Sequence, residues 1–297
     1  MKGRRRDKLI PINLGAIVRP NGWDARVATL LANLSGMPAD DRSVYIDECR
    51  EETWAHPDLL SALRELVGNK CWYSEVPLEG ADPNVDHFRP KGRVKEVDEN
   101  LQPTKNLLPG YWWWAFDWRN FRLAAMHSNQ RRVDLETDGG KADFFPVSGA
   151  RAVPGSDYAI CVEDVIPIDP CKHTDVALLW FDADGTPTCS AWKRTKSKED
   201  EWRVKVSIWL YHLDKREIVS RRREHMDQMR AELLNADTDY RLWKSAEGNV
   251  ISKNSFETRL NTIKALISSK SEFSGAKRAA IKAASAQYTW IDEFGLV

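Results

Sequence analysis

The chain reads VDHFRPK over residues 85–91, so an acidic side chain stands directly before a histidine and two basic side chains follow. An Asp-His pair suits three settings: a salt-bridged core histidine, a metal ligand, or a general base beside a metal ion. The stretch alone does not decide between them, but the sequence farther along does.

A second polar segment reads FDWRNFRLAAMHSNQRR over residues 116–132 and contributes Asn120 and Asn129. Hard divalent cations prefer oxygen ligands, which the carboxylate of Asp86 and the amide of Asn129 both provide. Hydrolysis of a phosphodiester needs a metal ion to stabilise charge on the phosphate and a base to activate water. The residue types therefore suit metal-dependent hydrolysis, with Asp86 and Asn129 as the candidate metal ligands.

The spacing of Asp86-His87, Asn120 and Asn129 resembles the HNH, or ββα-metal, nuclease motif. Further stretches are similar to one bacterial subgroup of that family, the HNH effector subunits of Septu-type and related antiviral systems. The resemblance covers residues 69–147, and more weakly 166–171. The matching stretches are CWYSE (71–75), DHFRPK (86–91), GYWWWAFDWRN (110–120), AMHSN (125–129), KADFFP (141–146) and IPIDPC (166–171).

The resemblance implies a role for each polar residue. His87 would be the general base, oriented by a backbone carbonyl, and Asn120 would pin the loop between the two strands. Asp86 and Asn129 would bind Mg²⁺ or Mn²⁺. His127, two residues before Asn129, is an alternative or additional metal ligand.

Basic residues follow both polar segments. We expect these side chains to contact phosphates that flank the cut. The alternative for each is an exposed salt bridge. The residues are Arg89, Lys91, Arg131, Arg132 and Lys141.

A structural zinc site is not expected. Many members of the subgroup carry two CxxC pairs that bind zinc. Here the four positions read Cys71, Ser74, Ala125 and Ser128, so three of the four thiolates are missing. Packing by nearby tryptophans is the expected replacement: Trp72, Trp112, Trp113, Trp114 and Trp118.

The fold class expected is α+β, with a ββα-metal core between N-terminal helices and a mainly helical C-terminal region. Residues 1–68 would form an arm and helices, residues 69–150 the nuclease core, and residues 151–297 a mixed and then helical region that suits a partner interface.

Apolar periodicity predicts helices over the segments 23–34, 57–67, 198–234, 255–268 and 276–294. The stretches KCWYSEV and NVDHF are expected as strands, and residues 92–115 as a loop. Asp184-Gly185 is predicted as a turn between two strands.

Composition limits the class of protein. The 297 residues carry 44 basic and 44 acidic side chains, so net charge does not favour nucleic-acid binding, although residues 87–133 hold nine basic against four acidic residues. No run approaches the roughly 20 apolar residues that span a bilayer, and the N-terminus lacks a signal-like apolar stretch. Five cysteines without a CxxC pair fit reduced thiols. We expect a cytoplasmic protein without membrane association.

The expected function is that of a metal-dependent endonuclease acting on DNA, as the effector subunit of an anti-phage complex. The chain lacks a Walker-type phosphate-binding loop, so ATP use would belong to an ATPase encoded by a neighbouring gene. Two alternatives remain: a stand-alone restriction-type nuclease, and a catalytically weak scaffold that binds nucleic acid or protein. The sequence leaves RNA or tRNA open as substrates.

Overall fold

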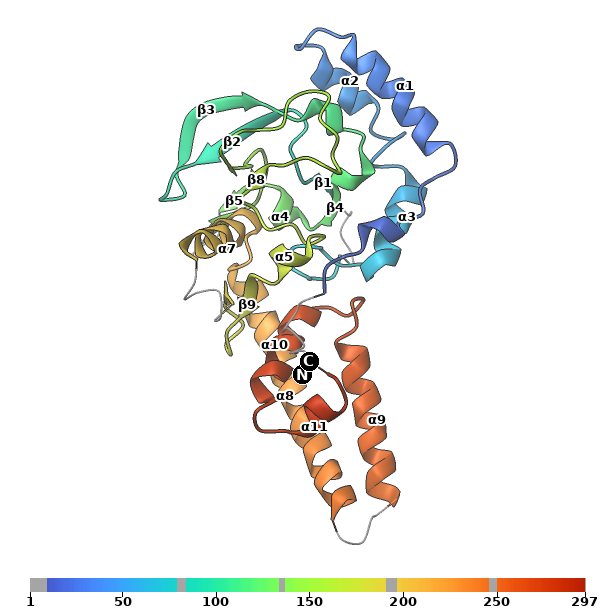
Figure 1. The fold of residues 1–297 in the computed structure, drawn as a ribbon, viewed down its shortest axis with the longest axis vertical. Coiled ribbons are helices and arrows are strands. Elements are labelled where there is room, and N and C mark those ends of the chain that lie inside the picture. The colour runs from blue at the N-terminus through green and yellow to red at the C-terminus, as the bar shows by residue number, and fades with distance from the viewer. Residues whose placement is uncertain (1–9, 79–83, 134–136, 191–196, 246–249, 297) are drawn as a thin grey trace.

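The computed structural model describes residues 10–78, 84–133, 137–190, 197–245 and 250–296. Figure 1 shows a rounded body that contains the strand pairs and the N-terminal helices, and an arm of two long helices that extends from it. The chain is a mixture of helices and short antiparallel strand pairs, so the α+β class is confirmed.

The N-terminal region consists of a 3-10 turn η1 (Leu14–Ala16) and helices α1 (Trp23–Ser35), α2 (Arg42–Glu48) and α3 (Pro57–Val67). Proline suits the first turn of α3, where backbone N–H groups have no helical partner. The glycine after that helix has a positive φ of 81°. Both predicted helices of this region are therefore confirmed, within one residue.

The strands at the centre of the body are β1 (Asn84–His87) and β4 (Phe121–Ala124), which pair antiparallel with Asp86 opposite Arg122. The one-turn helix α4 (Met126–Asn129) follows β4 directly. The segment KCWYSEV, predicted as a strand, is instead a series of turns held by one bridge between Lys70 and Pro77.

The prediction of a loop between β1 and β4 is wrong in part. Residues 92–115 contain an antiparallel hairpin of β2 (Arg93–Val97) and β3 (Pro103–Pro109), and then the 3-10 turn η2 (Trp112–Trp114). A further 3-10 turn, η3 (Trp118–Asn120), leads into β4. The hairpin forms because Val94 is fully buried in a small second core beside Phe88 and Tyr111.

Short elements follow α4: the strand pair β5 (Arg132–Val133) with β6 (Asp138–Gly139), the pair β7 (Val147–Ser148) with β8 (Asp164–Val165), and helix α5 (His173–Val176). The pair β9 (Leu179–Phe181) with β10 (Pro187–Cys189) encloses the predicted Asp184-Gly185 turn, where the glycine has a φ of 88°.

The C-terminal region contains α7 (Lys198–Tyr211), α8 (Arg216–Lys244), α9 (Val250–Leu266), α10 (Ser274–Ala284) and α11 (Trp290–Glu293). The single helix predicted over residues 198–234 is wrong, because the chain leaves the helix at His212, whose φ is +53°. The helix predicted over 276–294 ends at residue 284. In the described part of the chain, no helix has both the length and the apolar composition that crossing a membrane requires.

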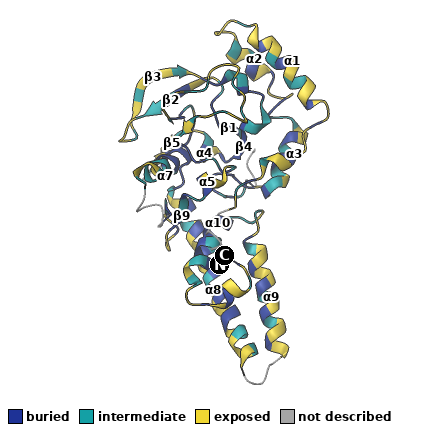
Figure 2. Ribbon diagram, in the orientation of Figure 1, coloured by how far each residue is buried: buried dark blue, intermediate teal, exposed yellow. Residues whose placement is uncertain are grey.

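One hydrophobic core joins all three regions. Its fully buried side chains include Leu34 and Leu63 from the N-terminal helices, Phe121 from β4, Leu210 from α7 and Ile291 from the C-terminal end. Figure 2 shows these buried positions continuing from the body into the facing sides of α8 and α9. The N-terminal and C-terminal helices therefore support the strands around β1 directly.

Candidate active site at the end of strand β1

A cleft with a volume of about 640 Å³ opens beside the end of β1. Its walls come from α2, α3, β1 with the loop that follows it, the last residue of α4, and residues 141–143. The polar and charged residues that line it are Ser43, Asp47, Arg50, Asn84, Asp86, His87, Lys91, Arg93, Asn129, Lys141 and Asp143.

Asp86 and His87 both line this cleft, although neighbours on a strand normally face opposite sides. Both are buried, with exposed fractions of 3% and 6%. His87 is the last residue of β1, and the chain turns immediately after it. The end of the strand thus brings a carboxylate and an imidazole to one place.

Asn120 holds that turn. Its side-chain Oδ1 accepts a hydrogen bond from the backbone N–H of Arg89 at 2.8 Å, and its Nδ2 donates to the carbonyl oxygens of Arg89 at 3.0 Å and Trp114 at 3.2 Å. Its own carbonyl accepts from the N–H of Phe88 at 2.7 Å. Asn120 is fully buried, so these bonds form away from water and fix the chain beside His87.

The imidazole of His87 is oriented by a backbone carbonyl. Its Nε2 lies 2.8 Å from the carbonyl oxygen of Ala115. Because a carbonyl oxygen only accepts, Nε2 carries the proton, and the neutral ring has its lone pair on Nδ1. The rings of Trp54 and Phe121 pack edge-on against the imidazole, with centroids 4.8 Å and 5.2 Å away.

Burial lowers the pKa of His87 to about 3. The positive charges of Lys91 and Lys141 lower the pKa further, while the hydrogen bond to the Ala115 carbonyl opposes them. At neutral pH the ring is therefore uncharged, and Nδ1 presents a lone pair.

Both carboxylate oxygens of Asp86 accept hydrogen bonds from protein groups. Oδ2 accepts from the hydroxyl of Tyr73 at 2.6 Å, and Oδ1 accepts from Nζ of Lys141 at 2.8 Å. The pKa of Tyr73 is raised well above its usual value by burial and then by the Asp86 charge, so the phenol keeps its proton and donates.

Tyr73 is a site residue that the sequence reasoning missed. Its ring stacks on that of Tyr211 at the end of α7, with centroids 3.9 Å apart and an interplanar angle of 10°. The hydroxyl of Tyr211 donates to the carbonyl of Ile168 at 2.9 Å instead. The tyrosine in CWYSE was the available signal, but nothing in the sequence relates it to Asp86.

Lys141 requires a correction. We predicted a phosphate contact, yet its side chain is 1% exposed and donates to Asp86 and to the carbonyl of His87, at 2.7 Å for the latter. Gly140 permits this approach: its φ is +106°, and a Cβ there would lie 1.9 Å from the carbonyl oxygen of Gln130. The N–H of Lys141 also donates to the carbonyl of Ser128.

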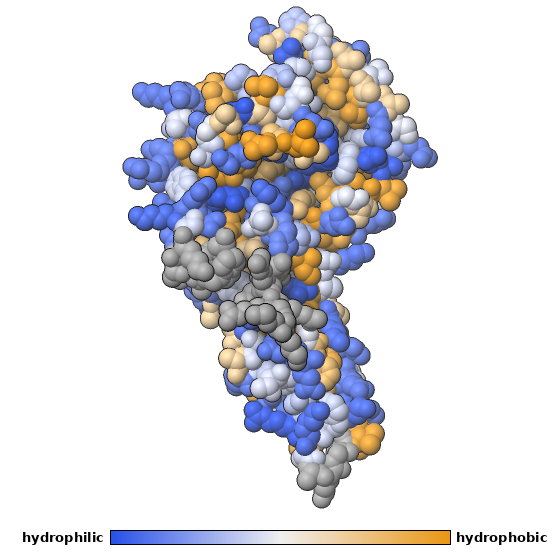
Figure 3. Space-filling model, in the orientation of Figure 1, coloured by the Kyte–Doolittle hydropathy of each residue, from blue (hydrophilic) through white to orange (hydrophobic). Residues whose placement is uncertain are grey.

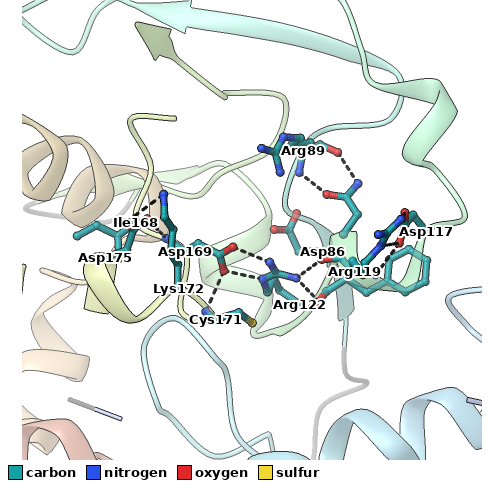
Figure 4. A network of polar contacts seen from close by, with 12 residues as sticks. Asp86, Arg89, Asp117, Arg119, Arg122, Ile168, Asp169, Cys171, Lys172 and Asp175 are labelled. Carbon is teal, nitrogen blue, oxygen red and sulfur yellow. Dashed lines mark hydrogen bonds and ion pairs between the residues drawn. The ribbon is translucent and has the colours of Figure 1, made fainter. Parts of the chain in front are cut away.

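Arg89 also lies inside the protein and does not suit a phosphate contact. Its guanidinium pairs with Glu163 at 2.7 Å and lies 5.0 Å from the ring centroid of Trp114 and 4.8 Å from that of Tyr158. Its backbone hydrogen-bonds to the amide of Asn120, and Figure 4 shows Arg89 above the ion pair of Arg122 with Asp169.

Arg122 lies on β4 opposite Asp86 and is 1% exposed. Its Nε and Nη2 donate to the two oxygens of Asp169 at 2.9 Å and 2.7 Å, and its Nη1 donates to the carbonyls of Arg119 and Phe121 (Figure 4). This buried bidentate pair fastens the IPIDPC segment, residues 166–171, to the strand that carries the site.

Among the other predicted phosphate contacts, Lys91 lines the cleft and pairs with Asp47 at 2.6 Å. Arg131 does not line it: this side chain pairs with Asp138 and lies 4.2 Å from the ring centroid of Trp209. Arg132 is exposed and contacts Met126.

Two arginines of the cleft wall were not among the sequence-predicted site residues. Arg50, in the turn after α2, and Arg93 on β2 both line the cleft. Arg93 pairs with Asp143 at 2.6 Å, and Arg50 lies 3.7 Å from Glu51. Both side chains are more than half exposed, which leaves them accessible to a bound polyanion.

Asn129 and His127 lie in different surroundings. Asn129 lines the cleft with Asp86 and His87, whereas His127 is not in its wall. The Nε2 of His127 lies 3.2 Å from the hydroxyl of Ser74, which does not line the cleft either. Burial, with His212 and nearby cations, lowers its pKa to about 4. This position does not suit a metal ligand beside Asp86.

The four positions compared above with zinc-binding cysteines are all buried, and three of them, Cys71, Ser74 and Ser128, are joined by hydrogen bonds. The thiol of Cys71 lies 3.7 Å from the hydroxyl of Ser128 and accepts from the N–H of Ser74 at 3.5 Å. Of the tryptophans expected to pack here, Trp72, Trp112 and Trp118 belong to or pack against the same core as Cys71, whereas Trp113 and Trp114 belong to the separate second core.

The donors in the cleft suit a hard divalent cation. Within the described residues, no three His, Cys, Asp or Glu side chains gather into a metal centre. The carboxylate of Asp86 has about four lone-pair positions, of which Tyr73 and Lys141 use two. No described residue hydrogen-bonds the side chain of Asn129. Asp86 and Asn129 therefore retain oxygen positions for a cation that takes its remaining ligands from water and phosphate, as Mg²⁺ commonly does.

No family model and no curated protein matches the chain. The geometry of the cleft is therefore the basis on which its function is inferred.

Proposed function

We propose that the chain is a metal-dependent endonuclease of the ββα type that hydrolyses phosphodiester bonds in DNA. The observation that carries this proposal is the meeting of Asp86, His87 and Asn129 in one cleft. The order of elements supports it, since two antiparallel strands, β1 and β4, are followed by the short helix α4 that ends in Asn129.

In the proposed reaction His87 takes a proton from the attacking water through Nδ1. The Ala115 carbonyl at Nε2 and the Asn120 contacts at the turn keep the ring aimed. Asp86 and Asn129 would hold the cation, which when bound supplies positive charge to the scissile phosphate and leaving oxygen. Lys91, Arg93 and Arg50 line the cleft, and in this proposal they bind phosphates along it.

The proposed setting is an anti-phage complex in which a separate ATPase controls this nuclease. Its support is the sequence resemblance, together with the surface of the arm. Figure 3 shows that the arm is largely hydrophilic on the face in view, with an apolar patch near its tip. The apolar side chains exposed near the ends of α8 and α9 are Leu242, Val250 and Ile251.

A scaffold that binds nucleic acid without cutting it is the second candidate. The ion pair between Lys141 and Asp86 favours it, because it places a positive group on the oxygen that a metal ion would use. Against it stands the aimed, uncharged His87, which a scaffold does not need.

The test is nicking of supercoiled plasmid by the purified chain with Mg²⁺ or Mn²⁺, with and without the neighbouring ATPase that the resemblance implies. His87→Ala should abolish nicking while leaving the protein folded. His173→Ala is the control, since His173 is exposed and does not line the cleft. Equal nicking by His87→Ala and wild type would remove His87 as the base. Retained DNA binding without nicking in every condition would support the scaffold.

A further inference from the structure

We propose that the ammonium of Lys141 occupies a cation position on Asp86 and thereby sets the affinity of the site for a divalent metal ion. The inference rests on the proposed function, because it concerns the same metal site. Lys141 would be a positioning residue that acts through Asp86.

The ammonium of Lys141 and the carboxylate of Asp86 are in direct contact, and both are buried. Nζ of Lys141 lies 2.8 Å from Oδ1 of Asp86, and the two side chains are 1% and 4% exposed. Such a pair is far less screened than a surface salt bridge, so the ammonium strongly opposes a second cation on the same carboxylate.

Lys141 also has an anchor that does not depend on Asp86. The same Nζ donates to the carbonyl of His87 at 2.7 Å. The backbone of residues 141 and 142 is fixed to α4 through the carbonyls of Ser128 and Asn129, at 2.9 Å and 2.7 Å. The ammonium can therefore stay beside the cleft when a metal ion displaces it from Asp86.

A different role would follow if Lys141 only oriented the carboxylate. In that case its loss would leave Asp86 free to rotate, and metal binding would weaken. The two roles predict changes of opposite sign in metal affinity, which makes them separable by one measurement.

The measurement is Mn²⁺ binding by isothermal titration calorimetry, without nucleic acid. Lys141→Gln removes the charge, and we expect its Kd to be at least about tenfold lower than that of wild type. Lys141→Arg keeps the charge and should bind like wild type. Lys70→Gln is the matched control: it removes a buried charge that pairs with Glu75 outside the cleft, and we expect a change of less than about threefold.

A second measurement uses the wild-type protein and does not depend on how well Lys141→Gln folds. The ¹⁵Nζ signal of Lys141, assigned by its loss in Lys141→Arg, should shift on saturation with Mg²⁺, and more than that of Lys91.

Equal or weaker Mn²⁺ binding by a folded Lys141→Gln, or an unmoved Lys141 signal in a protein that binds Mg²⁺, would overturn the inference and leave the nuclease proposal standing. Absence of metal binding in wild type and in all three variants would overturn the metal site itself. Asp86→Asn should abolish the binding, which ties the signal to this site.

Discussion

The side chain of Asn120 accepts a hydrogen bond from the N–H of Arg89 and returns one to the carbonyl of the same residue, at 2.8 Å and 3.0 Å. The side-chain amide of Asn120 thus pairs with both backbone groups of Arg89, as a neighbouring strand would, and this fixes the turn after β1. Since the turn carries the chain out of the strand directly after His87, the aim of the base depends on a side chain 33 positions away in the sequence.

Replacing Asn120 with Ala should cost both stability and activity. The change leaves the backbone groups of Arg89 without partners in a buried place, which typically costs about 1–3 kcal/mol of unfolding free energy. Urea unfolding measures this cost. Asn100→Ala, at an exposed position, is the control and should change the unfolding free energy by less than about 0.5 kcal/mol. Equal stability of the two variants would contradict the role assigned to Asn120.

Tyr73→Phe should lower cleavage about tenfold at limiting Mn²⁺, because Asp86 loses the donor that orients Oδ2. Tyr211→Phe is a matched control in the same aromatic stack, since its hydroxyl bonds to the Ile168 carbonyl instead. The measurement is the rate of nicking as a function of Mn²⁺ concentration. A similar loss in both variants would show that the stack, and not the hydrogen bond to Asp86, matters.

Acid should destabilise the folded chain in the window just below neutral pH. The pKa values of His87 and His127 are lowered by burial to about 3 and about 4, against about 6.5 in an unfolded chain. Between these values the unfolded state binds more protons, so the free energy of unfolding falls as pH falls below about 6.5. Each histidine contributes a slope of at most about 1.4 kcal/mol per pH unit.

Urea unfolding at several pH values between 7.5 and 5 checks this linkage. His127→Gln should reduce the slope, while His173→Ala, at an exposed position, should leave it unchanged. An identical slope in His127→Gln and wild type would show that His127 does not remain neutral in the folded state.

The positions of the missing zinc cysteines should still be able to form a zinc site. The triple variant Ser74→Cys, Ala125→Cys, Ser128→Cys completes four thiolates with Cys71, which already lies 3.7 Å from the hydroxyl of Ser128. We expect one zinc ion per chain by elemental analysis and a higher melting temperature with zinc, as structural zinc binding stabilises folded domains. The double variant without Ala125→Cys should bind zinc more weakly. No zinc in the triple variant would show that these backbone positions differ from a zinc knuckle.

The cleft cations should contribute to DNA affinity through phosphates. Lys91→Ala with Arg93→Ala should weaken binding and reduce the slope of log K against log salt by about 2, because each phosphate contact contributes roughly 0.9. Fluorescence anisotropy at several salt concentrations measures this slope. Lys264→Ala, on the arm, is the control. An unchanged slope in the double variant would place the DNA elsewhere.

Local sequence was enough for those features that depend on near neighbours. Pro57 and Gly68 mark the ends of α3, and Asp184-Gly185 marks a turn, because backbone conformation at these residues is set by the residues themselves. The polar set Asp86, His87 and Asn129 was also identified, through residue type and the resemblance to the HNH motif, and these side chains do line one cleft.

Long-range packing decided the rest. His212 leaves the helical conformation although its neighbours favour a helix, and KCWYSEV forms turns although its composition favours a strand. In both places tertiary contacts outweigh local preference.

The charges show the difference most clearly. By sequence, Arg89, Lys91 and Lys141 are equivalent candidates for phosphate contacts, but the fold gives each a different partner: Glu163 for Arg89, Asp47 for Lys91 and Asp86 for Lys141. The sequence by itself determined which chemical groups are present and the local turns that present them. Only the tertiary structure decided which charges are buried and paired, because the strength of an ion pair depends on distance and exclusion of water, and these arise from segments distant in the chain.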